Sequence, residues 1–330
     1  MLDARLTLAF DASGFAWPTE GTIAVFHSGE DANLRHVPKE RSVVIQPFFP
    51  AHAAFAGQGF VTAVDTSDQP RFTAAIVCLP RAKSEALSLI AAACASTDGP
   101  VLVDGQKTDG VDSILKAIRA RVSVEGPLSK AHGKLFWFSS CDAFADWASG
   151  PSLTPGGFWT APGVFSADGI DPASAMLADA LPDKLGAQVA DLGAGWGYLS
   201  AHLLTRQDIH AVHLVEAGHM ALECARRNVT DPRAVFHWAD VVHWQPPALM
   251  DTVVMNPPFH TSRAADPEIG RAFVAVAARI LAPRGQLWMV ANRHLPYEAT
   301  LSALFAKVEE VGGDARFKLL HFTRPTRKRK

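Results

Sequence analysis

Residues 188–197 read Gln-Val-Ala-Asp-Leu-Gly-Ala-Gly-Trp-Gly, an apolar run that leads directly into three alternating glycines. A short apolar run bounded by glycine is typical of a buried strand, and the amphipathic residues 198–205 that follow predict a helix. Because glycine has no side chain, a ligand can approach the backbone closely where the helix begins. The stretch therefore predicts a strand, a ligand-binding turn and a helix in succession.

The same alternation of apolar runs and helical patterns continues to the end of the chain. Strands separated by helices build a mainly parallel sheet with helices on both faces, so we expect a doubly wound α/β fold. The expected strands are 211–215, 234–238, 252–255, 286–291 and 317–322, and the further expected helices are 219–228, 269–281 and 299–307.

The first half of the chain shows a similar pattern in shorter pieces. Its expected strands are 22–26, 42–46, 60–64, 74–79, 101–103, 121–124 and 135–138, with helices at 84–95 and 112–120. Half of residues 150–163 are glycine or proline, as expected of a linker. A length of 330 residues also favours two domains. We therefore place one α/β domain at 1–152 and another at 153–330.

Composition excludes several classes of protein. With 48% hydrophobic and 19% charged residues, the chain is too apolar to be disordered. No apolar run approaches the roughly 20 residues that span a bilayer, and the charged N-terminal segment lacks a signal-peptide core. The four cysteines form no C-x-x-C pair, and the histidines form no common ligand motif. We expect a cytoplasmic protein without a metal.

The spacing of the glycines distinguishes two classes of ligand. A dinucleotide turn has the pattern G-x-G-x-x-G, which would put its third glycine where this chain has Tyr198. Here Gly193, Gly195 and Gly197 form G-x-G-x-G instead. This spacing favours a nucleoside without pyrophosphate, such as S-adenosylmethionine, over NAD.

Acidic residues associated with three successive expected strands point to the same ligand. Asp191 lies in the first strand, Glu216 ends the second and Asp240 follows the third. The carboxyl ends of parallel strands share one edge of a sheet, so these side chains are expected to converge there. Glu216 would accept hydrogen bonds from ribose hydroxyls, and Asp240 would accept one from the adenine amino group. The alternative for each acid alone is a helix cap.

Asn256-Pro257-Pro258-Phe259 follows the expected strand 252–255 and indicates the reaction. Two prolines fix the backbone and remove two donors, which leaves the Asn256 side-chain oxygen and the Pro257 carbonyl as acceptors for an exocyclic amine. Phe259 offers a flat face on which a base can stack. His260 either receives a proton or shapes the loop. We expect Asn256, Pro257 and Phe259 to serve methyl transfer to nitrogen.

Five segments together resemble the class I S-adenosylmethionine-dependent methyltransferases, and more narrowly the bacterial ribosomal RNA guanine-N2 methyltransferases of both subunits. They are FSADGIDPAS (165–174), ADLGAGWG (190–197), VVMNPPFH (253–260), VANRHLPY (290–297) and ARFKLL (315–320). The resemblance implies a catalytic domain at 153–330 that methylates a guanine of 16S ribosomal RNA in the small subunit.

The resemblance also implies what the rest of the chain does. Domain 1–152 would be a degenerate methyltransferase fold for RNA binding or support, with residues 100–119 in place of the glycine turn. Residues 165–174 would close over the methionine end of the cofactor, with Asp168, Asp171 and Ser174 as candidate residues. By its position alone, Asp171 before Pro172 is a helix N-cap. A monomer is favoured.

Other assignments stay open at this point. The same Asn-Pro-Pro-aromatic pattern serves methyltransferases of large-subunit RNA, protein glutamine and DNA adenine. A catalytically silent RNA-binding factor for ribosome assembly is a further alternative. The basic end of the chain either contacts RNA phosphates or is a solvated terminus; its cations are Arg316, Lys318, Arg324, Arg327, Lys328, Arg329 and Lys330.

Overall fold

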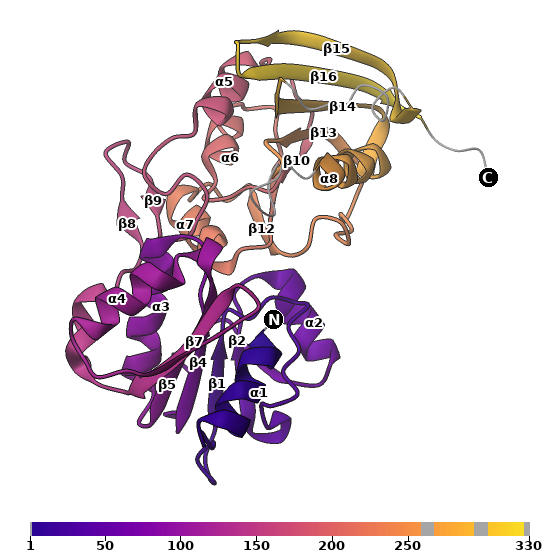
Figure 1. Ribbon diagram of the computed structural model, residues 1–330. Coiled ribbons are helices and arrows are strands. Elements are labelled where there is room, and N and C mark those ends of the chain that lie inside the picture. The colour runs from indigo at the N-terminus through magenta and orange to yellow at the C-terminus, as the bar shows by residue number, and fades with distance from the viewer. Residues whose placement is uncertain (1, 259–266, 294–302, 327–330) are drawn as a thin grey trace. The chain divides into compact units, whose positions relative to one another are not determined.

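The computed structural model describes residues 2–258, 267–293 and 303–326. They form two compact units, one of Met1–Pro151 with Ala161–Gly163, the other of Ser152–Thr160 with Val164–Lys330. Each unit contains a sheet whose described strands number seven, with helices around it (Figure 1). The expected α/β fold with two doubly wound domains is confirmed.

The first unit has the strand order β3-β2-β1-β4-β5-β7-β6. Strands β3, β2, β1, β4 and β5 are parallel to one another, and β7 is antiparallel to both of its neighbours, β5 and β6. Its elements are α1 (Leu2–Ala12), β1 (Ile23–Phe26), β2 (Ser42–Ile45), α2 (Phe49–Gly57), β3 (Val61–Ala63), β4 (Ala74–Cys78), α3 (Lys83–Ser96), β5 (Pro100–Gln106), α4 (Val111–Arg119), β6 (Glu125–Lys130) and β7 (Gly133–Ser139), with short 3-10 turns at Lys39–Arg41, Lys107–Asp109 and Asp142–Trp147.

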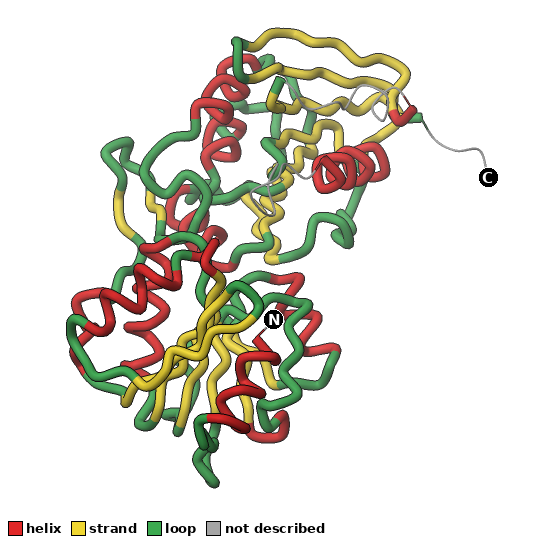
Figure 2. Tube along the Cα trace, in the orientation of Figure 1, coloured by secondary structure: helices red, strands yellow, loops and turns green. Residues whose placement is uncertain are grey.

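The second unit repeats this order strand for strand as β12-β11-β10-β13-β14-β16-β15. Figure 2 shows strands and helices alternating along its chain. Its elements are a hairpin of β8 (Ser152–Leu153) and β9 (Trp159–Thr160), then α5 (Pro172–Ala180), β10 (Gln188–Leu192), α6 (Tyr198–Leu203), β11 (Ala211–Glu216), α7 (His219–Asn228), β12 (Ala234–Trp238), β13 (Met250–Met255), α8 (Pro267–Ile280), β14 (Leu281–Asn292), β15 (Phe305–Gly313) and β16 (Phe317–Pro325).

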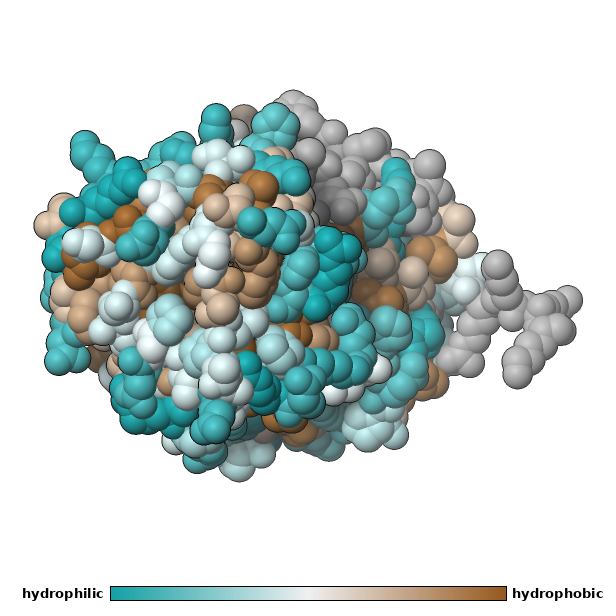
Figure 3. Space-filling view, turned by 60° about the horizontal axis from the view of Figure 1, so that its bottom comes forward, coloured by the Kyte–Doolittle hydropathy of each residue, from teal (hydrophilic) through white to brown (hydrophobic). Residues whose placement is uncertain are grey.

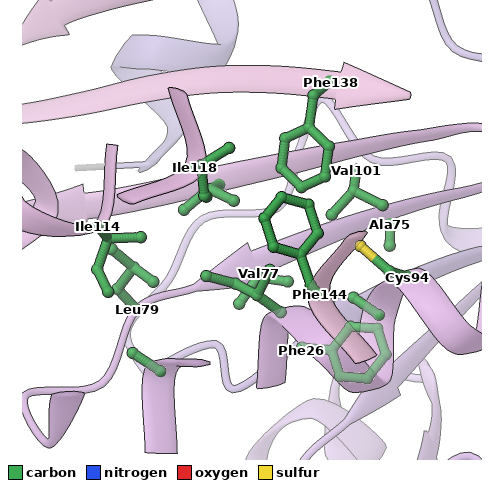
Figure 4. Close-up of a cluster of buried hydrophobic side chains, with 14 of the residues drawn as sticks. Phe26, Ala75, Val77, Leu79, Cys94, Val101, Ile114, Ile118, Phe138 and Phe144 are labelled. Atoms are coloured by element: carbon green, nitrogen blue, oxygen red, sulfur yellow. The ribbon is translucent and has the colours of Figure 1, made fainter. Parts of the chain in front are cut away.

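Alternate residues of the central strands bury opposite faces of each sheet, as the period of two in a strand requires. In the second unit, Val253 and Met255 face the cluster that includes α8, whereas Val254 faces the cluster of α5, α6 and α7. In the first unit, α3 and α4 cover one face and α1 and α2 the other. Figure 4 shows the α3–α4 side, where the Phe138 and Phe144 rings meet edge to face at 5.2 Å.

The outer surface is mixed in polarity. Hydrophilic and hydrophobic residues are interspersed on the face that Figure 3 shows, as is usual for a protein surface in water. Within the described ranges, no helix is long and apolar enough to cross a membrane.

Two expected elements are wrong. The helix expected at 299–307 gives way to strand β15 from Phe305 onward, while residues 299–302 lie outside the described part. Pairing along β16 overrides the local helical pattern here. The strand expected at 121–124 is a turn, because the N–H groups of Arg121 and Val122 both donate to Ile118 at the end of α4.

A buried ion pair ties α1 to the sheet of the first unit. The Arg5 guanidinium donates from Nε and Nη2 to the two carboxylate oxygens of Asp104 on β5, at 2.5 and 2.8 Å. Its Nη1 donates to the Lys130 carbonyl at 3.0 Å. Arg5 is only 1% exposed, so removing one partner would leave the other charge buried and unpaired.

We expect Arg5→Met to lower the free energy of unfolding of the first unit by about 3–5 kcal/mol, because Asp104 loses its partner. Urea denaturation measures this change. Asp104→Leu serves as the second arm of a double-mutant cycle, and the double variant should lose clearly less than the sum of the single losses. Additive losses would show that the two side chains do not interact.

A histidine pair lies on the sheet of the second unit. His213 Nδ1 and His237 Nε2 are 2.9 Å apart, and both rings contact Trp244. Burial, with His213 nearby, lowers the pKa of His237 to about 4, and burial also lowers the pKa of His213. Both imidazoles are therefore neutral in the folded protein at pH 7.

Unfolding exposes these rings, which then bind protons below their ordinary pKa of 6.5. Stability should therefore fall as the pH drops from about 6.5 toward 4, by at most about 1.4 kcal/mol per pH unit for each proton taken up. We expect His237→Phe to lose less unfolding free energy than wild type between pH 7 and pH 5 in urea titrations. An equal loss in both proteins would contradict the role of the pair.

Candidate functional site

A pocket opens in the second unit at the carboxyl ends of β10 and β13. These strands are parallel neighbours with Asp191 opposite Val254, so the segments that follow them emerge at the same edge of the sheet. The space not filled by atoms measures about 390 Å³, open solvent at the mouth included. The lining residues are Phe165, Ser166, Asp171, Ser174, Gly193, Ala194, Gly195, Trp196, Tyr198, Leu199 and Asn256.

The three glycines after β10 have different roles although all have positive φ. Gly193, with φ 74°, begins the turn, and its N–H donates to the Val215 carbonyl at 2.9 Å. A Cβ at Gly195 would meet no described atom within 4 Å, so this glycine faces open space. A Cβ at Gly197 would lie 3.0 Å from Val229, so this glycine lets α6 pack against α7. Gly193 and Gly195 line the pocket, whereas Gly197 supports it.

Asn256 lies on the opposite wall, directly after β13. Its Nδ2 group donates to Asp171 Oδ2 at 3.0 Å and to Ser174 Oγ at 2.9 Å. A carboxylate only accepts hydrogen bonds, so the nitrogen of the amide must face Asp171 and the oxygen must face away. Pro257 is buried and Pro258 is exposed. The end of β13 therefore presents an acceptor that the N-terminus of α5 holds in place.

Asp171 also begins α5, as its position before Pro172 predicts. Its Oδ2 accepts the backbone N–H of Ser174 at 2.8 Å, which makes it the N-cap of the helix. Asp168, the neighbouring candidate, is exposed and does not line the pocket. The structure therefore brings Asp171 and Ser174 to the site together with Asn256, and leaves Asp168 outside it.

Glu216 holds the glycine turn from the neighbouring strand. Its Oε2 accepts the N–H of Gly195 at 2.8 Å, and its Oε1 accepts the N–H of Gly218 at 2.7 Å. Burial raises the pKa of this carboxyl, and the backbone N–H groups oppose the shift. The carboxylate keeps further lone pairs for a ligand, so its expected contact with ribose stays a prediction.

The other two expected acids, like Glu216, are not among the residues that line the pocket. Asp191 is completely buried and accepts a hydrogen bond from Ser200 Oγ at 2.7 Å, while its Oδ1 has no partner among the described residues. Burial raises its pKa to about 7. Asp240 accepts the N–H of Val242 at 2.9 Å and lies 2.7 Å from His243 Nδ1, so it caps a turn. Cofactor contact by either acid stays a prediction.

The pocket also has an aromatic rim that the sequence reasoning missed. Phe165 is 64% exposed, and its carbonyl accepts the N–H of Trp196 Nε1 at 3.1 Å. The Trp196 ring contacts Phe158 and Tyr198, with centroids 5.0 and 5.7 Å away. Trp196, between the second and third glycines, was the sequence feature that could have predicted this rim, because so large a side chain in a tight turn packs against other side chains.

Several expected site residues lie outside the described part of the chain. These are Phe259, His260 and the basic residues Arg327, Lys328, Arg329 and Lys330. Their expected roles stay predictions. Across the described ranges, no cluster of three or more histidine, cysteine, aspartate or glutamate side chains is arranged to hold a metal ion.

The matched strand order allows the first unit to be compared position by position. Val25 lies opposite Ile76 as Asp191 lies opposite Val254, so β1 corresponds to β10 and β4 to β13. His27, with φ 57°, takes the place of Gly193. Its N–H donates to the Ile45 carbonyl at 3.0 Å, the counterpart of the bond from Gly193 to Val215. The counterpart of the glycine turn therefore follows β1.

This comparison corrects the expectation for residues 100–119. They contain β5, which corresponds to β14 and not to the strand before the glycine turn. The reason is that an apolar run followed by Gly105 and Gly110 has the local pattern of a strand and a glycine turn. The position of a strand in the sheet, however, depends on its pairing with other strands.

The side chains at the corresponding positions differ in their chemistry. Gln46 replaces Glu216, and its Nε2 donates to the Ser28 carbonyl at 2.7 Å. In the second unit the turn donates an N–H, that of Gly195, to Glu216, whereas in the first unit the turn accepts a hydrogen bond from Gln46. Cys78 replaces Asn256, and burial together with nearby Asp104 raises the pKa of its thiol to about 12. The first unit thus keeps the fold and lacks both the acidic partner of the turn and the amide acceptor.

Comparison with known proteins identifies the family. The model of the methyltransferase small domain matches residues 156–321. Ribosomal RNA small subunit methyltransferase C of Shewanella sp. strain MR-4 is 32% identical over 267 residues, covering 77% of this chain and 78% of the relative. The protein of the same name from Hahella chejuensis is 33% identical over 169 residues, covering 50% of this chain and 49% of the relative.

A solved structure shares the fold over most of this chain. It is described as the T. thermophilus 16S rRNA N2 G1207 methyltransferase, RsmC, in complex with AdoMet and guanosine. Its TM-score is 0.79 at 23% identity, over 94% of this chain and 90% of that one. The domain match and the identity to the Shewanella protein show that this chain belongs to the methyltransferase small-domain family, in the group of ribosomal RNA small subunit methyltransferase C.

Proposed function

We propose that this chain transfers the methyl group of S-adenosylmethionine to the exocyclic N2 amine of a guanine in the 16S RNA of the small ribosomal subunit. The observation that carries the proposal is the Asn256 amide, whose oxygen is left as an acceptor beside the glycine turn. The relatives named for small-subunit RNA methylation support the choice of substrate.

The residues of the pocket fit an adenosine-based sulfonium cofactor. The backbone at Gly195 is open, and the carboxylate of Glu216 braces the turn from behind while keeping lone pairs for ribose hydroxyls. The turn leads into α6, whose first backbone N–H groups would be available to polar atoms of the bound cofactor. When bound, S-adenosylmethionine supplies a methyl group that its positively charged sulfur already activates.

The chain's own residues align the nucleophile. The Asn256 oxygen and the Pro257 carbonyl are the acceptors for the two N–H bonds of the guanine amine, and neither proline has an N–H to compete. With both hydrogens held, the nitrogen lone pair is left to form the bond to the methyl carbon as the carbon–sulfur bond breaks. The methylated amine then releases a proton to water. Alignment is the main contribution, so no strong base is needed.

Three further roles belong to the same proposal. Phe259 stacks on the flipped guanine, which offsets part of the few kcal/mol that unstacking the base costs. The first unit, without an amide acceptor at Cys78, contacts RNA or supports the catalytic unit. The basic residues from Arg324 to Lys330 contact phosphates, each contributing about −0.7 to −0.9 to the dependence of log affinity on log salt. A cytoplasmic location follows from a ribosomal substrate.

We expect Asn256→Ala to lower the rate of methyl transfer about 100-fold, because the amine loses its aligned acceptor. Small subunits lacking the modification are incubated with the protein and labelled S-adenosylmethionine, and the RNA is digested for nucleoside mass spectrometry. Wild type should yield N2-methylguanosine. Asn33→Ala is the matched control, since Asn33 lies in an exposed turn of the first unit.

Different products would point to the other candidate functions. Label only in large-subunit RNA, in N6-methyladenine or in protein glutamine would contradict the proposed substrate. If calorimetry finds no binding of S-adenosylmethionine, the catalytically silent factor would replace the enzyme.

The glycine turn offers a second test with a built-in comparison. Gly195→Ala and Gly197→Ala both put a side chain at positive φ, which costs about 1–2 kcal/mol in each. The new methyl at 195, a lining position, would meet no described atom within 4 Å, whereas the one at 197 would meet Val229 and Ala225. We expect calorimetry to show a loss of at least about tenfold in cofactor affinity only for Gly195→Ala. Gly197→Ala should show the larger fall in Tm, and the reverse pattern would contradict the assignment.

A further inference from the structure

The amide of Asn256 is not free to turn. Its Nδ2 group donates hydrogen bonds to Asp171 Oδ2 at 3.0 Å and to Ser174 Oγ at 2.9 Å. These partners lie 85 and 82 residues away in the sequence, at the start of α5. We propose that Asp171 and Ser174 are positioning residues, which fix the Asn256 amide so that only its oxygen is presented to the substrate amine. This inference rests on the proposed function.

The two ends of an amide have nearly the same shape and opposite hydrogen-bonding roles. If the Asn256 amide turned over, its NH₂ group would face the NH₂ group of the substrate, and two donors would meet. Binding of an amine therefore requires the oxygen on the pocket side. A side chain that can turn freely would present that oxygen only part of the time.

Asp171 prevents the turned state by its charge. A carboxylate has no hydrogen to donate, so a turned amide would place its oxygen about 3 Å from a carboxylate oxygen and would lose the hydrogen bond to Asp171. The Ser174 hydroxyl can donate as well as accept, so Asp171 is the residue that excludes the turned state, and Ser174 adds a second point of attachment. Asp171 is itself held in place, because the same Oδ2 caps α5 through the N–H of Ser174 and Pro172 fixes the first helical position. Ser174 is only 8% exposed, so its hydroxyl is also confined.

The geometry distinguishes this role from that of a cofactor ligand. Asp171 Oδ2 accepts hydrogen bonds from two protein groups, the backbone N–H of Ser174 in the helix and the Asn256 amide. If Asp171 acts through Asn256, its loss should affect the rate of the bound complex more than cofactor affinity. If Asp171 instead binds the cofactor directly, the affinity should fall first.

The key variant is Asp171→Asn. Asparagine is as good an N-cap as aspartate, so α5 keeps its first turn. Its amide can donate as well as accept, so the turned state of Asn256 is no longer excluded. We expect kcat for N2-methylguanosine formation to fall about 10- to 100-fold, with the Kd for S-adenosylmethionine within about threefold of wild type and the Tm little changed. Ser174→Ala, which removes one acceptor and keeps the helix, should give a smaller fall in kcat.

Asp231→Asn is the matched control. Asp231 forms an ion pair with Arg233 just before β12 begins. This is the amino end of the strand, whereas the site lies at the carboxyl ends of β10 and β13. This variant should retain wild-type kcat and Kd. A large rise in Kd with kcat preserved in Asp171→Asn would overturn the proposal in favour of a cofactor ligand. Unchanged kcat in Asp171→Asn would also overturn it.

A measurement without substrate separates this inference from the proposed function. The side-chain NH₂ signals of Asn256 in a ¹⁵N NMR spectrum are identified by their absence in Asn256→Asp. Because both hydrogens are bonded, they should exchange slowly with water in wild type and Asp231→Asn, and at least about tenfold faster in Asp171→Asn. Fast exchange in wild type would overturn the positioning role. Slow exchange with no methylation of any guanine would reject the proposed function alone.

Discussion

Parallel pairing of β10 with β13 is the constraint on which the site depends. Because the two strands run side by side in one direction, the glycine turn and Asn256 emerge at the same edge of the sheet, although Asn256 lies 61 positions after Gly195 in the sequence. Side chains from α5 then complete the wall. The glycine turn and the Asn256 amide thus become neighbours through the pairing of the backbone strands.

The first unit shows that this backbone arrangement alone does not make a site. It has the same strand order and the same hydrogen bond where the turn leaves the sheet, yet His27, Gln46 and Cys78 stand in place of glycine, carboxylate and amide. A glutamine that donates to the Ser28 carbonyl satisfies the turn internally. Comparison of the two units therefore shows that the fold supplies the strand order and the turn, whereas the glycine, the carboxylate and the amide at these positions are features of the second unit.

Four acidic residues of the second unit have hydrogen-bond partners within the protein. Asp240 caps a turn, and Asp191 is buried against Ser200. Glu216 braces the glycine turn, and Asp171 begins α5 while holding Asn256. Residue type and spacing grouped Asp191, Glu216 and Asp240, whereas Asp171 was expected as a helix N-cap or, from the family resemblance, near the cofactor. Their individual partners come from elements that are distant in the sequence, so spacing could not assign them.

The sequence by itself determined the α/β class, the strands from Gln188 to Trp238, and the glycine turn with Asn-Pro-Pro, because hydrophobic period, glycine and proline act locally. It failed where local pattern and long-range pairing disagree, at β15 and at residues 121–124. Only the tertiary structure decided that the Asn256 amide faces Asp171 with its nitrogen, and that the counterpart of the glycine turn follows β1. Both depend on hydrogen bonds between segments far apart in the chain, whose partners become known only when the sheet is assembled.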